Sequence, residues 1–170
     1  MPVFIEKSAD IPFAVEQICI SKLFDNGTIC ASEQAIVAEK SVAAMVEEEF
    51  RKRKACILSP EQVKLLEKTV YDAEKKLMNA EIVGQSAITI AKKAGLDVPA
   101  DTQLLIAPLK GVGEEYPISS EILAPVLAYY IADDFEQAVN ICIDLNYHGG
   151  IGHTASMFSN DDEKINQFSM

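Results

Sequence analysis

Residues 24–38 read FDNGTICASEQAIVA, and this stretch organises the chain around it. Asp25-Asn26-Gly27 is strong turn chemistry, because these residue types accept the backbone angles that tight turns need. Ala35-Ile36-Val37-Ala38 is an unbroken apolar run of strand length, which predicts a buried strand. Cys30 therefore lies in a loop between a turn and a strand.

A helix is expected just before this turn. Asp10 is a suitable N-cap, and the apolar residues that follow have helical spacing: Ile11, Ala14, Val15, Ile18 and Cys19. The helix should end near Phe24, because the turn chemistry begins at Asp25.

The same alternation of helices and apolar runs continues along the chain. We expect strands at 2–5, 55–58, 104–107, 122–131 (interrupted at Pro125) and 154–158. We expect one helix capped by Ser41 and one capped by Asp133 or Asp134. Ser59 begins a capping box, and the helix that it starts should run to about Tyr71. Another helix should end at Gly95, and a last one should open at 160–163. The segments 108–120 and 148–153 are expected to be glycine-rich loops.

Strands separated by helices imply right-handed βαβ crossovers and a mostly parallel sheet. Strands buried on both faces read as continuous apolar runs, as they do here. The predicted fold is therefore α/β, a mostly parallel sheet flanked by helices, in one domain over residues 1–170.

Composition excludes several classes of protein. The net charge of −11 argues against nucleic-acid binding, which needs a basic face. The one basic run, Arg51-Lys52-Arg53-Lys54, falls where a helix should end, and cations suit that end of the helix dipole. No window approaches the roughly 18 apolar residues of a membrane span, and no signal peptide is visible. We therefore expect a cytoplasmic protein with reduced thiols.

The chain has four cysteines, whose spacing matches no zinc or redox motif. Cys19 and Cys142 lie on apolar helix faces and Cys56 in a strand, so these three are expected to be core residues. Cys30 lies in a loop, where a thiolate can meet substrate, although a small buried apolar residue is the simpler interpretation from the residues alone.

Both histidines, His148 and His153, lie in the last glycine-rich loop. They could supply a base or half of a metal site, but no Asp or Glu lies close by in sequence, so no metal is expected. Gly150-Ile151-Gly152 formally starts a dinucleotide fingerprint, which must follow a strand and open a helix. Here the order is reversed, so that interpretation is rejected. Glu121 alone reads as a solvated loop residue.

Two longer stretches carry a resemblance to a known family. Residues 24–34 closely resemble the catalytic-cysteine segment of coenzyme A-acylating aldehyde dehydrogenases. Within that family, the segment most closely resembles the aldehyde half of bifunctional aldehyde–alcohol dehydrogenases and acylating succinate-semialdehyde dehydrogenases. Residues 120–127 resemble the family's E-x-x-x-P-V segment, and residues 149–154 resemble a segment typical of the acylating branch.

The resemblance implies roles for particular residues. Cys30 would be the nucleophile, and Glu121 would hold the nicotinamide-ribose hydroxyls with Pro125 beside it in the cofactor-binding segment. The implied reaction interconverts an aldehyde and an acyl-CoA through a thioester on Cys30, with NAD or NADP as cofactor, coenzyme A as co-substrate and no metal. His153 would take the proton of coenzyme A or position its loop.

The resemblance also implies that part of the enzyme lies elsewhere. A full family member has a nucleotide-binding domain ahead of this region, which is absent from this chain, so the isolated domain is expected to be inactive and its parent to be a homo-oligomer. Two alternatives stay open. The chain could be a non-catalytic assembly domain, or a stand-alone cysteine acyltransferase or thioesterase that uses Cys30 and His153.

Overall fold

The computed structural model describes residues 1–169 and has one main sheet of six strands, all parallel, in the order β3-β6-β7-β2-β1-β8. The prediction of an α/β fold with a mostly parallel sheet is confirmed. The strands are β1 (Pro2–Ile5), β2 (Ala35–Glu39), β3 (Ala55–Ile57), β6 (Leu104–Pro108), β7 (Val126–Ala132) and β8 (Ser156–Phe158). The helices are α1 (Ile11–Leu23), α2 (Lys40–Lys52), α3 (Pro60–Val70), α4 (Ala87–Lys93), α5 (Phe135–Gly149) and α6 (Asp162–Phe168).

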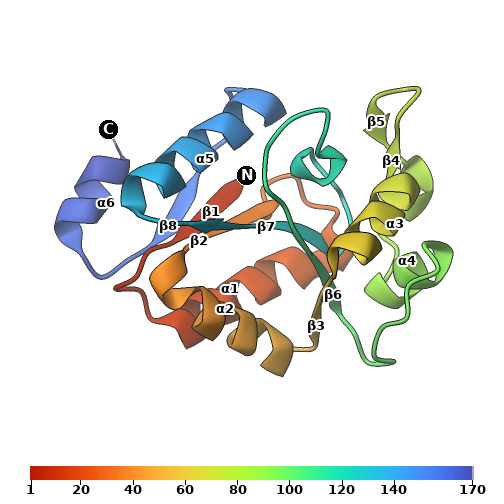
Figure 1. Ribbon diagram of the computed structural model, residues 1–170, viewed down its shortest axis with the longest axis horizontal. Helices are drawn as coiled ribbons and strands as arrows, with labels where there is room; N and C mark the ends of the chain where they lie inside the picture. Colours follow the sequence, from red (N-terminus) through yellow and green to blue (C-terminus); the bar gives the residue numbers. More distant parts are fainter. Residues whose placement is uncertain (170) are drawn as a thin grey trace.

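Helices cover both faces of this sheet (Figure 1). Helices α1 and α2 lie on one face, where their apolar sides pack on Val3, Ile5 and Ile36. Helices α3, α4 and α5 lie on the other face, against Phe4 and Val37. Because successive residues of a strand point to opposite faces, each strand contributes to both cores. The central strands are therefore buried on both sides, as their apolar sequences require.

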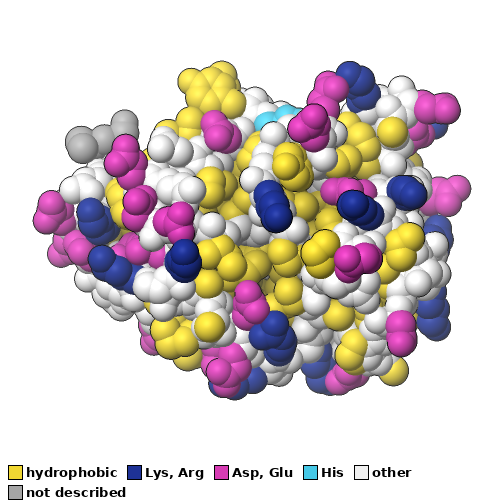
Figure 2. Space-filling view, viewed as in Figure 1, with side chains coloured by type: hydrophobic (Ala, Val, Ile, Leu, Met, Phe, Trp, Pro, Cys, Tyr) yellow, Lys and Arg dark blue, Asp and Glu magenta, His cyan; other side chains and the backbone are white. Residues whose placement is uncertain are grey.

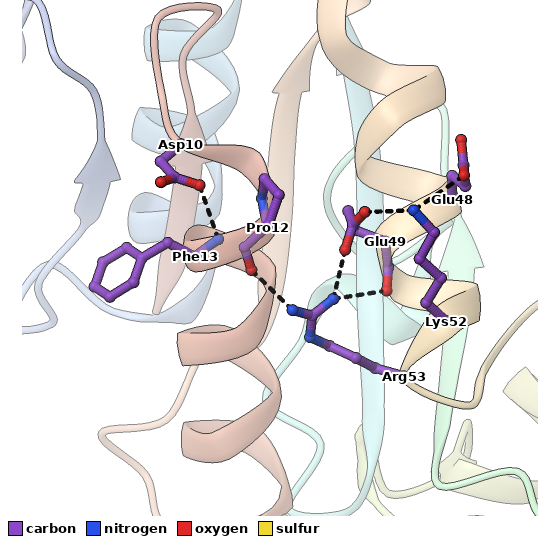
Figure 3. A network of polar contacts seen from close by, with 7 residues as sticks. All are labelled: Asp10, Pro12, Phe13, Glu48, Glu49, Lys52 and Arg53. Atoms are coloured by element: carbon purple, nitrogen blue, oxygen red, sulfur yellow. Dashed lines mark hydrogen bonds and ion pairs between the residues drawn. The ribbon is translucent and has the colours of Figure 1, made fainter.

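A polar network fixes α2 against α1 (Figure 3). The Arg53 guanidinium pairs with the Glu49 carboxylate at 2.6 Å and also donates to the Pro12 carbonyl oxygen at 3.1 Å. Lys52 binds Glu49 at 2.7 Å and Glu48 at 3.0 Å. The basic run therefore lies at a helix end, as the sequence predicted, and Arg53 in addition joins the two helices.

Most predicted helix boundaries are confirmed. The Asp10 side chain accepts from the Phe13 N–H, Ser59 forms a complete capping box with Gln62, and Asp134 accepts from the Gln137 N–H. The prediction for Ser41 is wrong: α2 begins at Lys40, directly after β2, and has no side-chain cap. No loop separates that strand from its helix, so Ser41 already lies within the first turn.

The strands differ most from the predictions at two places, and the strand expected over 154–158 begins only at Ser156. The strand expected over 122–131 begins only at Val126, because Pro125 has no N–H and the preceding residues form a tight turn in which the Ala124 N–H donates to Ile122 O. A small antiparallel hairpin, β4 (Tyr71–Asp72) with β5 (Leu77–Met78), was not expected from the sequence. Its strands have two residues each, too few to show a periodic pattern.

None of the helices within residues 1–169 combines the length and the hydropathy of a membrane span.

Candidate functional site

The loops that carry the predicted site residues meet at one edge of the sheet. Cys30 precedes β2, Glu121 precedes β7 and His153 precedes β8. Because all six strands run the same way, their amino ends lie along the same edge, and β7 and β2 are neighbours there. The parallel topology therefore brings together residues from three distant parts of the sequence.

Cys30 lies exposed in a short loop between two turns. Before it, Asp25 and Asn26 have left-handed backbone angles, with φ of 47° and 51°, and Thr28 Oγ1 donates to the Asp25 side chain at 2.9 Å. After it, the Ser32 N–H and hydroxyl both donate to the Ile29 carbonyl oxygen, at 3.0 and 2.8 Å. The loop is thus held from both sides while the thiol faces solvent.

Gly27 connects the cysteine loop to the segment that carries Glu121. Its φ is +76°, and a Cβ at this position would lie 2.6 Å from the Ala124 carbonyl oxygen and 3.2 Å from that of Lys22. Only glycine permits both the left-handed angle and this close approach of two backbones. The cysteine loop therefore packs directly on the backbone that leads into β7.

A small cavity of about 30 Å³ opens at this edge of the sheet. Its lining includes Gln34, the residue just before β2, Glu121 from the segment before β7, and His153 from the loop before β8. Ser119 and Asn146 add further polar groups. The structure thus brings Glu121 and His153 to one cavity, while neither Cys30 nor Pro125 lines it.

The two predicted cofactor residues differ in exposure. Glu121 is exposed at the rim of the cavity, in a loop several residues before β7, which agrees with its interpretation as a solvated loop residue. Pro125 is buried, and its carbonyl oxygen accepts the Leu105 N–H at 3.0 Å, which opens the pairing of β6 with β7. Pro125 therefore fixes where the strand begins.

The two histidines have different surroundings. The prediction that His148 lies in a loop is wrong, because α5 continues to Gly149 and His148 lies in its last turn. The His148 Nε2 lies 2.9 Å from the hydroxyl of Ser120, the residue before Glu121. His153 lies in the exposed loop after α5, and its backbone N–H donates to the Gly150 carbonyl oxygen at 3.2 Å. Histidine side chains reach the surface where α5 ends, at the top of Figure 2.

Sequence reasoning missed Lys22, a fully buried lysine beneath the site. Its ammonium donates to Gln34 Oε1 at 2.9 Å and to the Ile122 carbonyl oxygen at 3.1 Å. Burial lowers the pKa of Lys22 to about 7, although the nearby charges of Glu33 and Glu121 act in the opposite direction. The signal was available, because Lys22 continues the apolar face of α1 four positions after Ile18.

The other three cysteines are less accessible than Cys30, but only Cys19 and Cys142 are core residues as expected. Burial raises the pKa of the Cys19 thiol to about 11 and that of Cys142 to about 12. Cys56 is half-buried in β3, where desolvation also raises its pKa. A raised pKa leaves little thiolate at neutral pH, so these three thiols are poor nucleophiles.

No group of three or more histidine, cysteine or carboxylate side chains that could hold a metal ion occurs within residues 1–169.

Comparisons with known proteins agree with this architecture. The aldehyde dehydrogenase family model matches residues 1–170. An aldehyde-alcohol dehydrogenase of Clostridium acetobutylicum is 41% identical over 171 residues, which cover 99% of this chain and 20% of that protein. A succinate-semialdehyde dehydrogenase (acetylating) of Clostridium kluyveri is 34% identical, over 96% of this chain and 36% of that protein.

Solved structures show the same fold. An acetylating aldehyde dehydrogenase from Geobacillus thermoglucosidasius superposes with a TM-score of 0.96 at 38% identity, covering 100% of this chain and 37% of that one. A probable aldehyde dehydrogenase from Listeria monocytogenes gives 0.95 at 47% identity, covering 99% and 37%. The chain thus spans 20% to 37% of the length of these four relatives, and it belongs to the aldehyde dehydrogenase family.

Proposed function

We propose that this chain is the cysteine-bearing catalytic part of a longer coenzyme A-acylating aldehyde dehydrogenase, with Cys30 as its nucleophile. The observation that carries the proposal is the exposed Cys30, held between two turns at the sheet edge where Glu121 and His153 also lie. The names of the relatives support the acylating branch, since two are described as acetylating enzymes.

The proposed chemistry passes through a covalent bond to Cys30. The Cys30 thiolate adds to the aldehyde carbonyl carbon and gives a thiohemiacetal, whose oxyanion the Cys30 backbone N–H would stabilise together with a donor from outside this chain. Loss of hydride converts this adduct into a thioester on Cys30. NAD or NADP, when bound, accepts that hydride. The coenzyme A thiolate then attacks the thioester carbonyl, and the Cys30 thiolate leaves.

Glu121 is the proposed ligand of the nicotinamide ribose. Its carboxylate is exposed at the rim of the cavity, where it can accept hydrogen bonds from hydroxyl groups. The neighbouring Gln34 offers an amide in the same cavity. A carboxylate and an amide that line one cavity suit a sugar hydroxyl, so the residues present fit this part of the cofactor.

The histidine that handles the coenzyme A proton has two candidates. His153 shares the cavity with Glu121, which favours the role that the sequence suggests. His148 is supported by a separate observation. Alanine variants of one cysteine and one histidine of a propionaldehyde dehydrogenase from Clostridium phytofermentans have been solved, and those two residues are as far apart in sequence as Cys30 and His148. Separate His148→Ala and His153→Ala variants decide between them by the rate of acyl transfer to coenzyme A.

The four cysteines are all unpaired, which fits a cytoplasmic enzyme whose nucleophile must stay reduced.

The proposal is tested by trapping the acyl group on Cys30. The protein is incubated with acetyl-CoA without nucleotide, and peptide mapping by mass spectrometry locates the thioester. We expect the acetyl group on Cys30, its removal by hydroxylamine, and its absence in Cys30→Ala but not in the control Cys142→Ala. Acetylation that persists in Cys30→Ala contradicts the assignment of the nucleophile. Turnover of acyl-CoA to free acid without nucleotide would instead indicate a thioesterase.

A further inference from the structure

Lys22, which has no role in the chemistry above, forms a buried polar unit with Gln34. Lys22 lies in the last turn of α1, and its Nζ donates to Gln34 Oε1 at 2.9 Å. The Ile122 N–H donates to the same oxygen at 3.2 Å, and the Ile122 carbonyl oxygen accepts from Lys22 at 3.1 Å. The unit thus joins α1, the residue just before β2 and the segment that carries Glu121.

These contacts fix the orientation of the Gln34 amide. Both of its neighbours, Lys22 Nζ and the Ile122 N–H, are donors, so only the carbonyl oxygen of the amide can face them. The Gln34 Nε2 must then point the other way, and it is buried with no hydrogen-bond partner among the described residues. Gln34 is 7% exposed and lines the cavity shared with Glu121 and His153.

An unpartnered buried donor is costly, because it has given up water without a replacement. A buried lysine is costly too, and an apolar side chain of similar size at position 22 would avoid that desolvation. Both costs are present in the one unit that borders the cavity. A bound ligand that accepts a hydrogen bond from the Gln34 N–H would remove the first cost. It would also give the buried Lys22 a purpose, because Lys22 holds the amide in the orientation that the ligand needs.

We propose that Gln34 is a ligand-binding residue whose amide N–H donates to the oxygen of a ligand hydroxyl, and that Lys22 is the positioning residue that turns the amide toward the cavity. The hydroxyl oxygen accepts from Gln34 while its proton is donated to the Glu121 carboxylate. The cavity of about 30 Å³ has room for a hydroxyl or a water molecule but not for a sugar ring, so the ring stays outside it.

The ligand class is a ribose hydroxyl, and this choice rests on the proposed function. A hydroxyl is both donor and acceptor, so it satisfies a carboxylate and an amide N–H at once, which a carboxylate or phosphate ligand does not. An ordered water could occupy the same place, and the experiment separates the two.

The test compares two nucleotides in the full-length protein. Dissociation constants are measured by calorimetry for the natural nucleotide and for an analogue that lacks the nicotinamide-ribose hydroxyls. Gln34→Met removes the donor, Lys22→Met releases the amide, and Gln17→Met on the partly exposed side of α1 is the matched control. We expect Gln34→Met and Lys22→Met to weaken binding of the natural nucleotide by about three- to tenfold. Neither should weaken binding of the analogue.

The outcomes separate the inference from the proposed function. Equal weakening for both nucleotides would mean a purely structural role for the pair, and no weakening would mean that the amide meets only water; either result overturns the inference. If Glu121→Gln weakens binding of the natural nucleotide and Gln34→Met does not, the inference alone fails. If Glu121→Gln also has no effect, the proposed role of Glu121 fails. Should Gln34→Met not fold, Gln34→Glu keeps the oxygen that Lys22 binds, and it should weaken binding of the natural nucleotide because it removes the donor.

Discussion

Cys30 differs from the other cysteines in its backbone surroundings as well as in its exposure. Replacing an exposed side chain in a loop removes little packing, so Cys30→Ala should change the free energy of unfolding by less than about 0.5 kcal/mol. The same variant should lower the rate of acyl transfer at least about a thousandfold, because a nucleophile has no substitute. Thermal unfolding and single-turnover kinetics check the two parts. A variant that keeps its rate would remove Cys30 from the mechanism.

Lys22 gives stability an unusual dependence on pH. Burial lowers the pKa of Lys22 in the folded chain to about 7, whereas in the unfolded chain the lysine keeps its ordinary pKa of about 10.5. Between those values the unfolded state binds more protons, so stability rises with pH, by at most about 1.4 kcal/mol per pH unit. Lys22→Met lacks this contribution. Its stability relative to the natural protein should therefore be greatest below pH 7 and should fall as pH rises toward 10.

Denaturant unfolding at several pH values measures this effect, with the exposed Lys40→Met as control. Curves for the natural protein and Lys22→Met that stay parallel from pH 7 to pH 10 would contradict the lowered pKa of Lys22.

At the scale of elements, the cysteine loop depends on one glycine. Gly27→Ala places a methyl group 2.6 Å from the Ala124 carbonyl oxygen in a left-handed conformation, so we expect a loss of about 2 to 4 kcal/mol in unfolding free energy. Gly95→Ala is the matched control: its φ is +68°, but its Cβ would meet nothing within 4 Å, so only the strain of about 1 kcal/mol remains. Equal losses in the two variants would show that the close approach to Ala124 is unimportant.

How far sequence predicts the elements depends on how local their causes are. The caps at Asp10 and Ser59 were predictable because each side chain bonds to a backbone only three residues away. The cap predicted at Ser41 was wrong because β2 runs directly into α2, so that Ser41 already lies inside the helix. The start of β7 was misplaced because the apolar residues before Pro125 were read as strand, whereas they form a tight turn that their hydrophobicity does not reveal.

The candidate site was predictable only in part, for the same reason. Cys30 and Glu121 were found through their resemblance to a family, and composition or periodicity alone favoured neither. Gln34 was missed because its meaning comes from two donors, Lys22 and Ile122, that are twelve and eighty-eight residues away in sequence. Sequence therefore supplies the reactive group, and the fold supplies what surrounds it.

At the scale of the whole molecule, stability should be greatest in the centre of the sheet. Strands β2 and β7 pair along five residues and are buried on both faces, whereas β3 and β8 have three residues each and lie at the two edges. Amide hydrogen exchange should therefore be slowest at Ile36, Val37 and Tyr130 and much faster at Met157. Exchange measured by NMR tests this order, and protection of β8 equal to that of β2 would contradict it.

The contact between Gly27 and Ala124 also has a consequence for motion. Two backbones that touch without an intervening side chain leave no free space between them, so a displacement of one loop must carry the other with it. The cysteine loop and the segment that carries Glu121 should therefore fluctuate with the same amplitude and at the same time. A nucleotide that binds at Glu121 would therefore also reduce the motion of the loop that carries Cys30. The sulfur of Cys30 would then become ordered only when the nucleotide is already bound.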